Sequence, residues 1–134
     1  MTVLKSETMP IASSEDIVIV RQAVRKQAIV LGLGIVDQTK VVTAASELAR
    51  NTLDYGRGGF VHIDVVERER RPGLRLTFED QGPGIPNIDL ALTDGYTSGN
   101  GMGLGLSGAR RLSHEFEIWS EAGKGTRVSI VRWK

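Results

Sequence analysis

The chain has 134 residues, and its 17 lysine and arginine side chains nearly balance 16 aspartate and glutamate side chains, for a formal net charge of +1. That balance argues against nucleic acid or an anionic membrane as the main partner, and the absence of cysteine excludes disulfides, thiolate zinc sites and a cysteine nucleophile. No apolar run approaches the ~20 residues of a membrane span and no signal-peptide pattern opens the chain, so we expect a cytoplasmic protein.

The N-terminal part of the chain predicts an edge strand and two helices. Within residues 1–12, proline is compatible with a strand at the edge of a sheet. Residues 13–16, Ser-Ser-Glu-Asp, are the expected start of a first helix, with a serine hydroxyl available for the N-cap, and Gly32 and Gly34 are expected to end it. Its apolar residues recur at spacings of three and four: Ile17, Val20, Val24, Ala28 and Leu31. Asp37 is the expected N-cap of a second amphipathic helix that extends to about Leu53.

A strand pair and a long loop follow the two helices. Residues 60–67 and 74–80 alternate apolar and polar side chains, as half-buried strands do, and residues 71–73, Arg-Pro-Gly, are the expected hairpin turn. Residues 81–105 are rich in Gly, Pro, Asn, Asp and Ser and have little periodicity. A loop of this length inside a compact domain is usually functional or mobile.

The C-terminal part predicts a third helix and a second strand pair. The helix is expected over residues 106–115, and the strands over residues 116–120 and 126–133 with a turn at 122–125. No repeat or linker divides the chain, so we expect a single domain over residues 1–134. This order of elements predicts an α+β fold, a two-layer sandwich with helices on one face of a mainly antiparallel sheet.

Two segments depart from these local patterns in ways that suggest a site. Glu47 and Asn51 are four residues apart, hence on one face of the second helix, and either side chain would need a polar partner if buried. Asp80 follows a predicted strand, where its carboxylate could accept a hydrogen bond from an exocyclic amine, and Gly82 and Gly84 allow close backbone approach. Taken singly, the first segment is also typical of a solvated helix face and the second of a plain turn.

A third segment has glycine at every second position ahead of the predicted third helix: Gly101, Gly103 and Gly105. Its exposed backbone amides and the helix N-terminus would form an anion site suited to phosphates, with a merely flexible loop as the alternative. The spacing from Gly103 to Gly108 also matches the dinucleotide-binding fingerprint, but no strand is predicted before it. A Walker A motif is absent, because residues 123–125 read Gly-Lys-Gly without the required Ser or Thr.

In this order and spacing, the three segments resemble the N, G1 and G2 boxes of the GHKL ATPases (gyrase, Hsp90, histidine kinase, MutL), with Thr126 as the closing threonine. The resemblance covers about residues 40–130 and implies a Bergerat ATP-binding fold that uses ATP and Mg²⁺. It implies that Asn51 supplies an amide oxygen to Mg²⁺, that Asp80 accepts the adenine amine with Thr126 nearby, and that Glu47 deprotonates the attacking hydroxyl. The implied glycines are Gly82 and Gly84 at the adenine and Gly101, Gly103 and Gly105 around the phosphates.

Within that superfamily the chain is most similar to the RsbT-type switch kinases of the bacterial stressosome, notably in residues 46–51, Ser-Glu-Leu-Ala-Arg-Asn, and residues 103–118. This similarity implies a kinase that phosphorylates a serine of an RsbS-like STAS-domain antagonist and, when released, activates a PP2C-type phosphatase. Alternatives are an RsbW-type anti-sigma factor kinase and a nucleotide-gated binding module with little catalysis. A sensor histidine kinase domain is disfavoured, because the chain lacks a dimerisation helix pair carrying a phosphoacceptor histidine.

Overall fold

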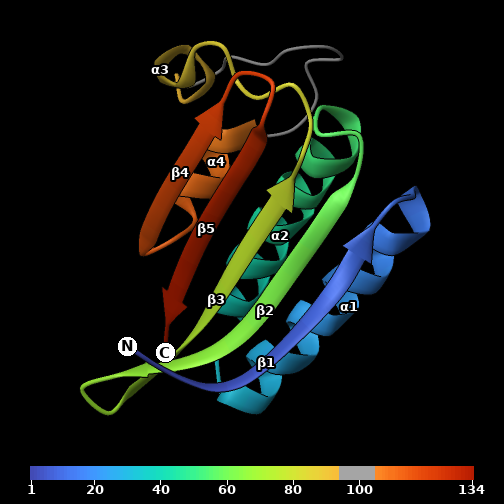
Figure 1. Cartoon of the computed structure of the whole chain (residues 1–134). Coiled ribbons are helices and arrows are strands. Elements are labelled where there is room, and N and C mark those ends of the chain that lie inside the picture. Colours follow the sequence, from blue (N-terminus) through green and yellow to red (C-terminus); the bar gives the residue numbers. More distant parts are fainter. Residues whose placement is uncertain (94–104) are drawn as a thin grey trace.

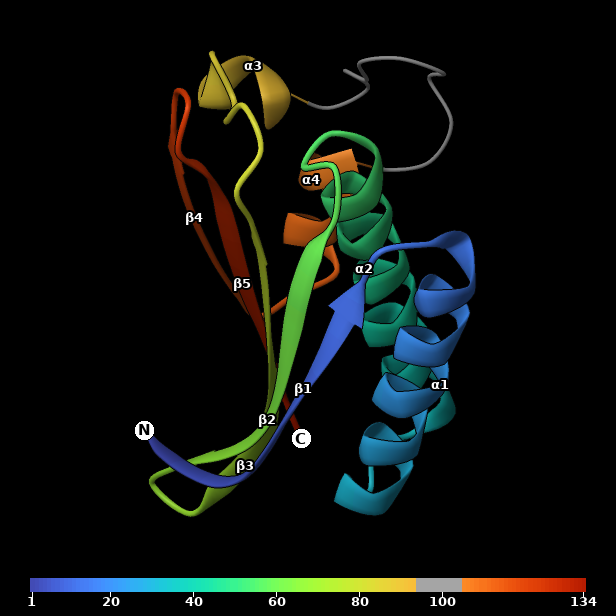
Figure 2. The same cartoon turned by 45° about the vertical axis from the view of Figure 1, so that its right-hand side comes forward.

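The computed structural model describes residues 1–93 and 105–134, which form one five-stranded sheet with helices packed on one side (Figures 1 and 2). The elements are β1 (Thr2–Ile11), α1 (Ser14–Leu31), α2 (Ile35–Asp54), β2 (Gly59–Arg68), β3 (Arg71–Asp80), α3 (Ile88–Ala91), α4 (Gly105–Arg111), β4 (Glu115–Glu121) and β5 (Gly125–Trp133). The strand order is β1-β2-β3-β5-β4, and all four neighbouring pairs are antiparallel. The predicted α+β sandwich is confirmed.

Figure 2 shows α1, α2 and α4 on the same face of the sheet, where the main core lies. The apolar stripe predicted for α1 is the buried one, and it includes Ile17, Val20, Val24 and Ala28. Ser13 caps this helix, because its hydroxyl accepts a hydrogen bond from the amide of Asp16, and Gly32 ends it in the left-handed conformation at φ 94°. β1 pairs only with β2, so the predicted edge strand is also confirmed.

The start of α2 differs from the prediction. Asp37 is not the N-cap: the helix begins at Ile35, and its N-cap Gly34 makes no side-chain hydrogen bond. Asp37 instead lies in the first turn and accepts a hydrogen bond at 2.6 Å from Arg132 of β5, and this bond holds the pKa of its carboxyl below the ordinary value. A carboxylate in the first turn is favourable without capping it, since it faces the positive end of the helix dipole.

The predicted turn at residues 71–73 is also wrong. The hairpin turns at Glu69 and Arg70, whose φ angles of 52° and 69° fit a two-residue primed turn, and residues 71–73 belong to β3. Gly73 has a different role, because a Cβ there would lie 2.5 Å from a ring carbon of Trp133 on the neighbouring strand. This glycine allows close packing of side chain on backbone instead of a bend in the chain.

Two smaller corrections concern the segments beside the long loop. The helix predicted over residues 106–115 ends at Arg111, and Glu115 already belongs to β4, where it pairs with Val131 of β5. The loop predicted over residues 81–105 contains the short helix α3, capped by the side chain of Asn87, which accepts a hydrogen bond from the amide of Leu90 at 3.0 Å. Pairing with β5 and a local cap therefore decide structure that the apolar periodicity does not show.

Candidate functional site

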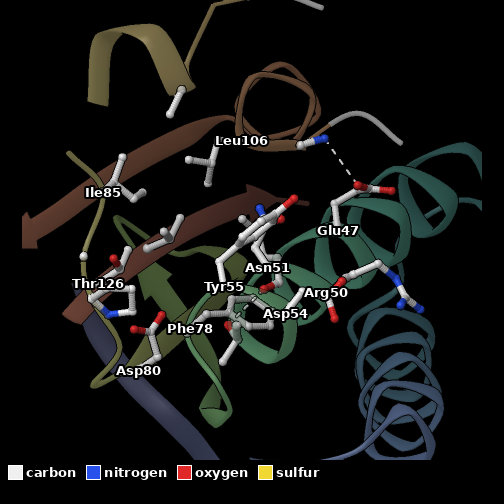
Figure 3. A pocket seen from close by; sticks show the side chains of 18 of the residues that line it. Glu47, Arg50, Asn51, Asp54, Tyr55, Phe78, Asp80, Ile85, Leu106 and Thr126 are labelled. Atoms are coloured by element: carbon white, nitrogen blue, oxygen red, sulfur yellow. Dashed lines mark hydrogen bonds between the residues drawn. The ribbon is translucent and has the colours of Figure 1, made fainter. Parts of the chain in front are cut away.

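A cavity of about 630 Å³ lies at the end of the sheet where β3 ends and β5 begins, between α2 and the loop that leads to α3 (Figure 3). This volume is typical of small-molecule binding sites. Six of the predicted site residues line it: Glu47, Asn51, Asp80, Gly84, Gly105 and Thr126. Figure 3 shows Asp80 and Thr126 at one end of the cavity, Glu47 at the other and Asn51 between them.

The walls between these polar residues are largely apolar. They include side chains from α2, β3, the loop, α3, α4 and β5: Leu48, Phe78, Ile85, Leu90, Leu106 and Val128. A cavity with apolar walls and a few polar groups at its ends suits a flat ring system that carries a polar edge.

Asp80 is the last residue of β3 and pairs with Thr126 of β5. Its Oδ1 accepts a hydrogen bond from the amide of Gly82 at 2.9 Å. Burial raises the pKa of the Asp80 carboxyl above its ordinary value, and the backbone amides of Gly82 and Thr126 act in the opposite direction. The cavity thus contains a carboxylate that has already lost part of its hydration.

Three glycines allow close packing at this end of the cavity, and Gly56 is the one that makes room for Asp80. Gly82 does not line the cavity itself, and a Cβ on it would lie 2.8 Å from the Cα of Gly56. A Cβ on Gly56 would lie 2.3 Å from Cγ of Asp80. Gly84 has a φ of 81°, and a Cβ there would lie 2.4 Å from the carbonyl oxygen of Glu121. Sequence reasoning did not identify Gly56, which is one of three glycines within residues 56–59 after the second helix.

Ser120 of β4 is a second residue that sequence reasoning missed. Its Oγ lies 2.8 Å from Oγ1 of Thr126 and accepts a hydrogen bond from the amide of Ile85 at 2.7 Å. The strand alternation held a signal, because Phe116 and Ile118 pack against the core and Ser120 continues the same side of β4 with a polar side chain. A polar residue at an inward position needs a partner, and here that partner is part of the cavity.

Glu47 and Asn51 are both half-buried and point into the cavity from α2, as their spacing predicts (Figure 3). Oε2 of Glu47 accepts a hydrogen bond from the amide of Gly105, the first residue of α4, at 3.2 Å. The side-chain amide of Asn51 makes no hydrogen bond within residues 1–93 and 105–134, so it is available to a ligand. Gly101 and Gly103 lie outside the described residues.

Comparison with models of protein families identifies the family of this chain. The family described as histidine kinase-, DNA gyrase B-, and HSP90-like ATPase matches residues 36–134. The chain belongs to this ATPase family. All the residues predicted for the site of this GHKL ATPase fall inside the matched segment, and the resemblance that the sequence motifs indicated is confirmed.

Individual relatives of this GHKL chain indicate which kind of GHKL protein it resembles. It is 45% identical over 118 residues to the serine/threonine-protein kinase RsbT of Bacillus subtilis (strain 168). The aligned segment covers 88% of this chain and 89% of that protein. The chain is 34% identical over 100 residues to an anti-sigma F factor of Clostridium kluyveri, with 70% of this chain and 69% of that protein covered. The predicted enzyme class, the serine/threonine protein kinases, is confirmed by the first relative.

A solved structure supports the fold. The crystal structure of the RsbU and RsbW domains of a Mycobacterium tuberculosis protein matches with a TM-score of 0.66 at 19% identity, over 96% of this chain and 31% of that chain. At this identity the match shows the GHKL fold alone. No helix in the described part of the chain is long and apolar enough to cross a membrane.

Proposed function

We propose that residues 1–134 form a single GHKL kinase domain that binds Mg-ATP and phosphorylates a serine of an RsbS-like STAS-domain antagonist in a cytoplasmic partner-switching pathway. Once released from the antagonist, the kinase would bind and activate a PP2C-type phosphatase. The observation that carries this proposal is the placement of Glu47, Asn51, Asp80 and Thr126 around one cavity, in a chain 45% identical to RsbT.

Asp80 and Thr126 are suited to recognise the base of the nucleotide. The Asp80 carboxylate can accept a hydrogen bond from the exocyclic amine of adenine, and the apolar walls can pack against the ring faces. Gly82 and Gly84 support this end of the cavity, because side chains at either position would collide with neighbouring backbone. We infer that adenine is preferred, since guanine has an oxygen where adenine carries the amine.

The residues at the middle of the cavity fit a magnesium ion held mainly by phosphates and water. No group of three or more His, Cys, Asp or Glu side chains in the described residues could hold a metal ion by itself. The amide oxygen of Asn51 is a suitable single protein ligand for Mg²⁺, which usually keeps several waters and phosphate oxygens. When bound, Mg²⁺ would neutralise phosphate charge during transfer. Gly101, Gly103 and Gly105 are proposed to surround the phosphates.

Glu47 is the proposed general base. It lies one helical turn before Asn51 and at the end of the cavity opposite Asp80 (Figure 3). The terminal phosphate would lie at this end if the adenine occupied the Asp80 end. There it can orient the serine hydroxyl of the partner and take its proton as the oxygen attacks the terminal phosphorus of ATP, whose bond to the leaving ADP oxygen breaks. Phosphoryl transfer depends mostly on positioning and charge neutralisation, so we expect the base to contribute less than the metal.

Two other functions use the same cavity. An RsbW-type anti-sigma factor kinase is favoured by the 34% identity to an anti-sigma F factor, and it would capture a sigma factor in place of a phosphatase. A nucleotide-gated binding module would bind ATP at the same residues and transfer little phosphate. The three functions differ in partner and in product, which makes them separable by experiment.

The test is to incubate the purified protein with labelled Mg-ATP and a purified STAS-domain protein, and to map any phosphate by mass spectrometry. We expect one phosphoserine on the STAS protein, and parallel pull-downs should retain a PP2C-type phosphatase. Retention of a sigma factor in place of the phosphatase would favour the anti-sigma function. ATP binding and partner capture without transfer would instead support the binding module.

A further inference from the structure

The hydroxyl of Ser120 makes three polar contacts beside the cavity. The amide of Ile85 lies 2.7 Å from its Oγ, the carbonyl oxygen of Gly125 lies at 3.1 Å, and Oγ1 of Thr126 lies at 2.8 Å. These contacts join β4 to β5 and to the loop after Gly84. Ser120 is not in contact with the proposed metal or phosphate residues, so its effect on a ligand must pass through Thr126 or the loop.

Counting protons fixes the direction of each hydrogen bond. A serine hydroxyl has one proton to donate and two lone pairs that can accept. The Ile85 amide can only donate, so it uses one lone pair of Ser120. The Gly125 carbonyl can only accept, so it receives the Ser120 proton. Either hydroxyl could donate in the remaining contact, and we assign it as a hydrogen bond from Thr126 to the second lone pair of Ser120, because the Ser120 proton is already used.

This arrangement determines what Thr126 can offer to a ligand. With its proton directed at Ser120, the Thr126 hydroxyl has only lone pairs left for the cavity that it lines. Asp80, its neighbour across the strand pair, also accepts hydrogen bonds when ionised. Both polar side chains at this end of the cavity therefore act as acceptors, which suits a base edge that donates and disfavours one that presents an oxygen.

We propose that Ser120 is a positioning residue that makes this end of the cavity acceptor-only, and so selects a purine with an amino group at position 6 over one with an oxygen there. The proposal deepens the proposed function and rests on it, since it takes the cavity as a nucleotide site. Without Ser120 the Thr126 proton is free to turn towards the ligand, and the carbonyl oxygen at position 6 of a purine becomes an acceptable partner.

The test compares ATP with inosine triphosphate, which has an oxygen in place of the adenine amine and a proton on the neighbouring ring nitrogen, by titration calorimetry in the presence of Mg²⁺. The parent protein should prefer ATP, and Ser120→Ala should narrow the ratio of the two affinities by about 10-fold, the worth of roughly one hydrogen bond. Ser120→Thr keeps the hydroxyl and should restore the parent ratio. Ser129→Ala is the matched control, because it removes a similar hydroxyl pair with Thr77 on the other face of the sheet.

A purely structural role for Ser120 would weaken both nucleotides equally and leave their ratio unchanged, and that result would overturn the proposal. If Ser120→Ala fails to fold, Thr126→Val tests the same claim, because it should weaken ATP while leaving inosine triphosphate nearly unaffected. Equal losses for both nucleotides in that variant would also overturn the proposal. Failure of the parent protein to bind either nucleotide would contradict the proposed function instead.

Discussion

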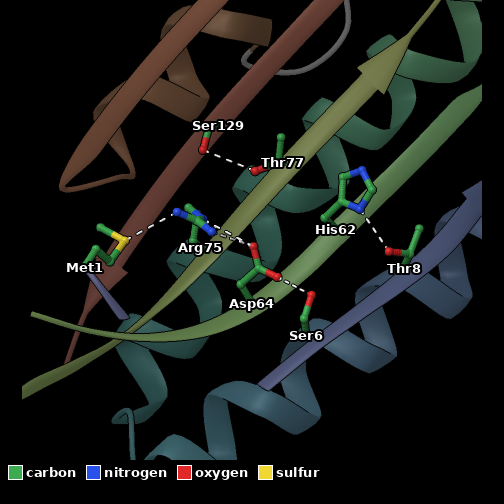
Figure 4. Close-up of polar contacts among 8 residues, drawn as sticks. All are labelled: Met1, Ser6, Thr8, His62, Asp64, Arg75, Thr77 and Ser129. Atoms are coloured by element: carbon green, nitrogen blue, oxygen red, sulfur yellow. Dashed lines mark hydrogen bonds and ion pairs between the residues drawn. The ribbon is translucent and has the colours of Figure 1, made fainter. Parts of the chain in front are cut away.

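Polar side chains lie on both sides of the sheet, and several of those on the open face are paired with one another, whereas a half-buried amide beside the cavity has no such partner. On the open face, Asp64 accepts hydrogen bonds from Ser6 and Arg75, His62 contacts Thr8, and Thr77 contacts Ser129 (Figure 4). On the helix-covered side, Asn51 is half-buried and its side-chain amide has no hydrogen-bond partner in the described residues. Polar side chains alone therefore do not locate the site, whereas the unpaired amide of Asn51 points to the cavity.

The largest expected effect comes from removing the basicity of Glu47. Glu47→Gln keeps the shape and an oxygen that can accept from Gly105, so Mg-ATP should bind as before. Transfer of phosphate to the STAS protein should fall by at least about 10²-fold, the low end for loss of a general base. Phosphoserine formation followed by mass spectrometry gives the rate. Glu79→Gln, on the open face beside His62, is the matched control and should retain the parent rate. Transfer at the parent rate in Glu47→Gln would show that Glu47 is not the base.

The next largest effect concerns recognition of the adenine by Asp80. In Asp80→Asn the side-chain oxygen can keep the amide of Gly82, which turns the new NH₂ group towards the amine of adenine. We expect ATP affinity to fall by ~1.5–3 kcal/mol, the range for a hydrogen bond to a charged group, as measured by calorimetry. Asp64→Asn alters a carboxylate on the open face and should leave ATP affinity unchanged. Similar losses of affinity in the two variants would remove the distinction between the faces.

A smaller effect is expected at Gly56, which lies against Asp80. Gly56→Ala is compatible with the backbone, because Gly56 is not among the glycines with positive φ, but its Cβ would force Asp80 to move. ATP affinity should fall by about 10-fold, or roughly one hydrogen bond. Gly34→Ala is the control, since a Cβ there meets nothing within 4 Å. Unchanged calorimetric affinity in Gly56→Ala would mean that the position of Asp80 does not matter.

The smallest effect is on stability, and it should have opposite signs on the two faces. Burial raises the pKa of Asp80 in the folded protein, so the parent loses stability as the pH rises through that pKa. Asp80→Asn should therefore unfold at higher denaturant than the parent at pH 7, and this gain should vanish below about pH 4. Asp64→Asn, which weakens the pair with Arg75, should unfold at lower denaturant at pH 7. A stability loss in Asp80→Asn would contradict this account.

The sequence predicted features that depend on neighbours along the chain. The cap at Ser13, the stripe of α1, the shared face of Glu47 and Asn51 and the strand before Asp80 follow from local periodicity and capping. Spacing also identified the family, because several boxes in a fixed order are more specific than any one of them.

Several features that the sequence did not predict depend on contacts between distant segments. Asp37 serves as partner to Arg132, 95 residues away, and not as a helix cap. Gly56 and Ser120 belong to the site only because the end of α2 and strand β4 meet Asp80 and Thr126 in the fold. A glycine after a helix carries no local mark of such a contact. The alternation of β4 shows that Ser120 faces inward and needs a partner, but it does not show which residue that partner is.

Hydrogen exchange of the protein with and without saturating Mg-ATP tests the location of the site most directly. We predict slower exchange for the amides of residues 51–58, 80–87 and 105–109, segments that contain residues lining the cavity, because a bound ligand restricts local opening. Residues 62–68 of β2, which lie away from the cavity, should keep their rates. Protection of residues 62–68 without protection of the cavity segments would contradict this prediction, and so would unchanged exchange everywhere at saturating nucleotide.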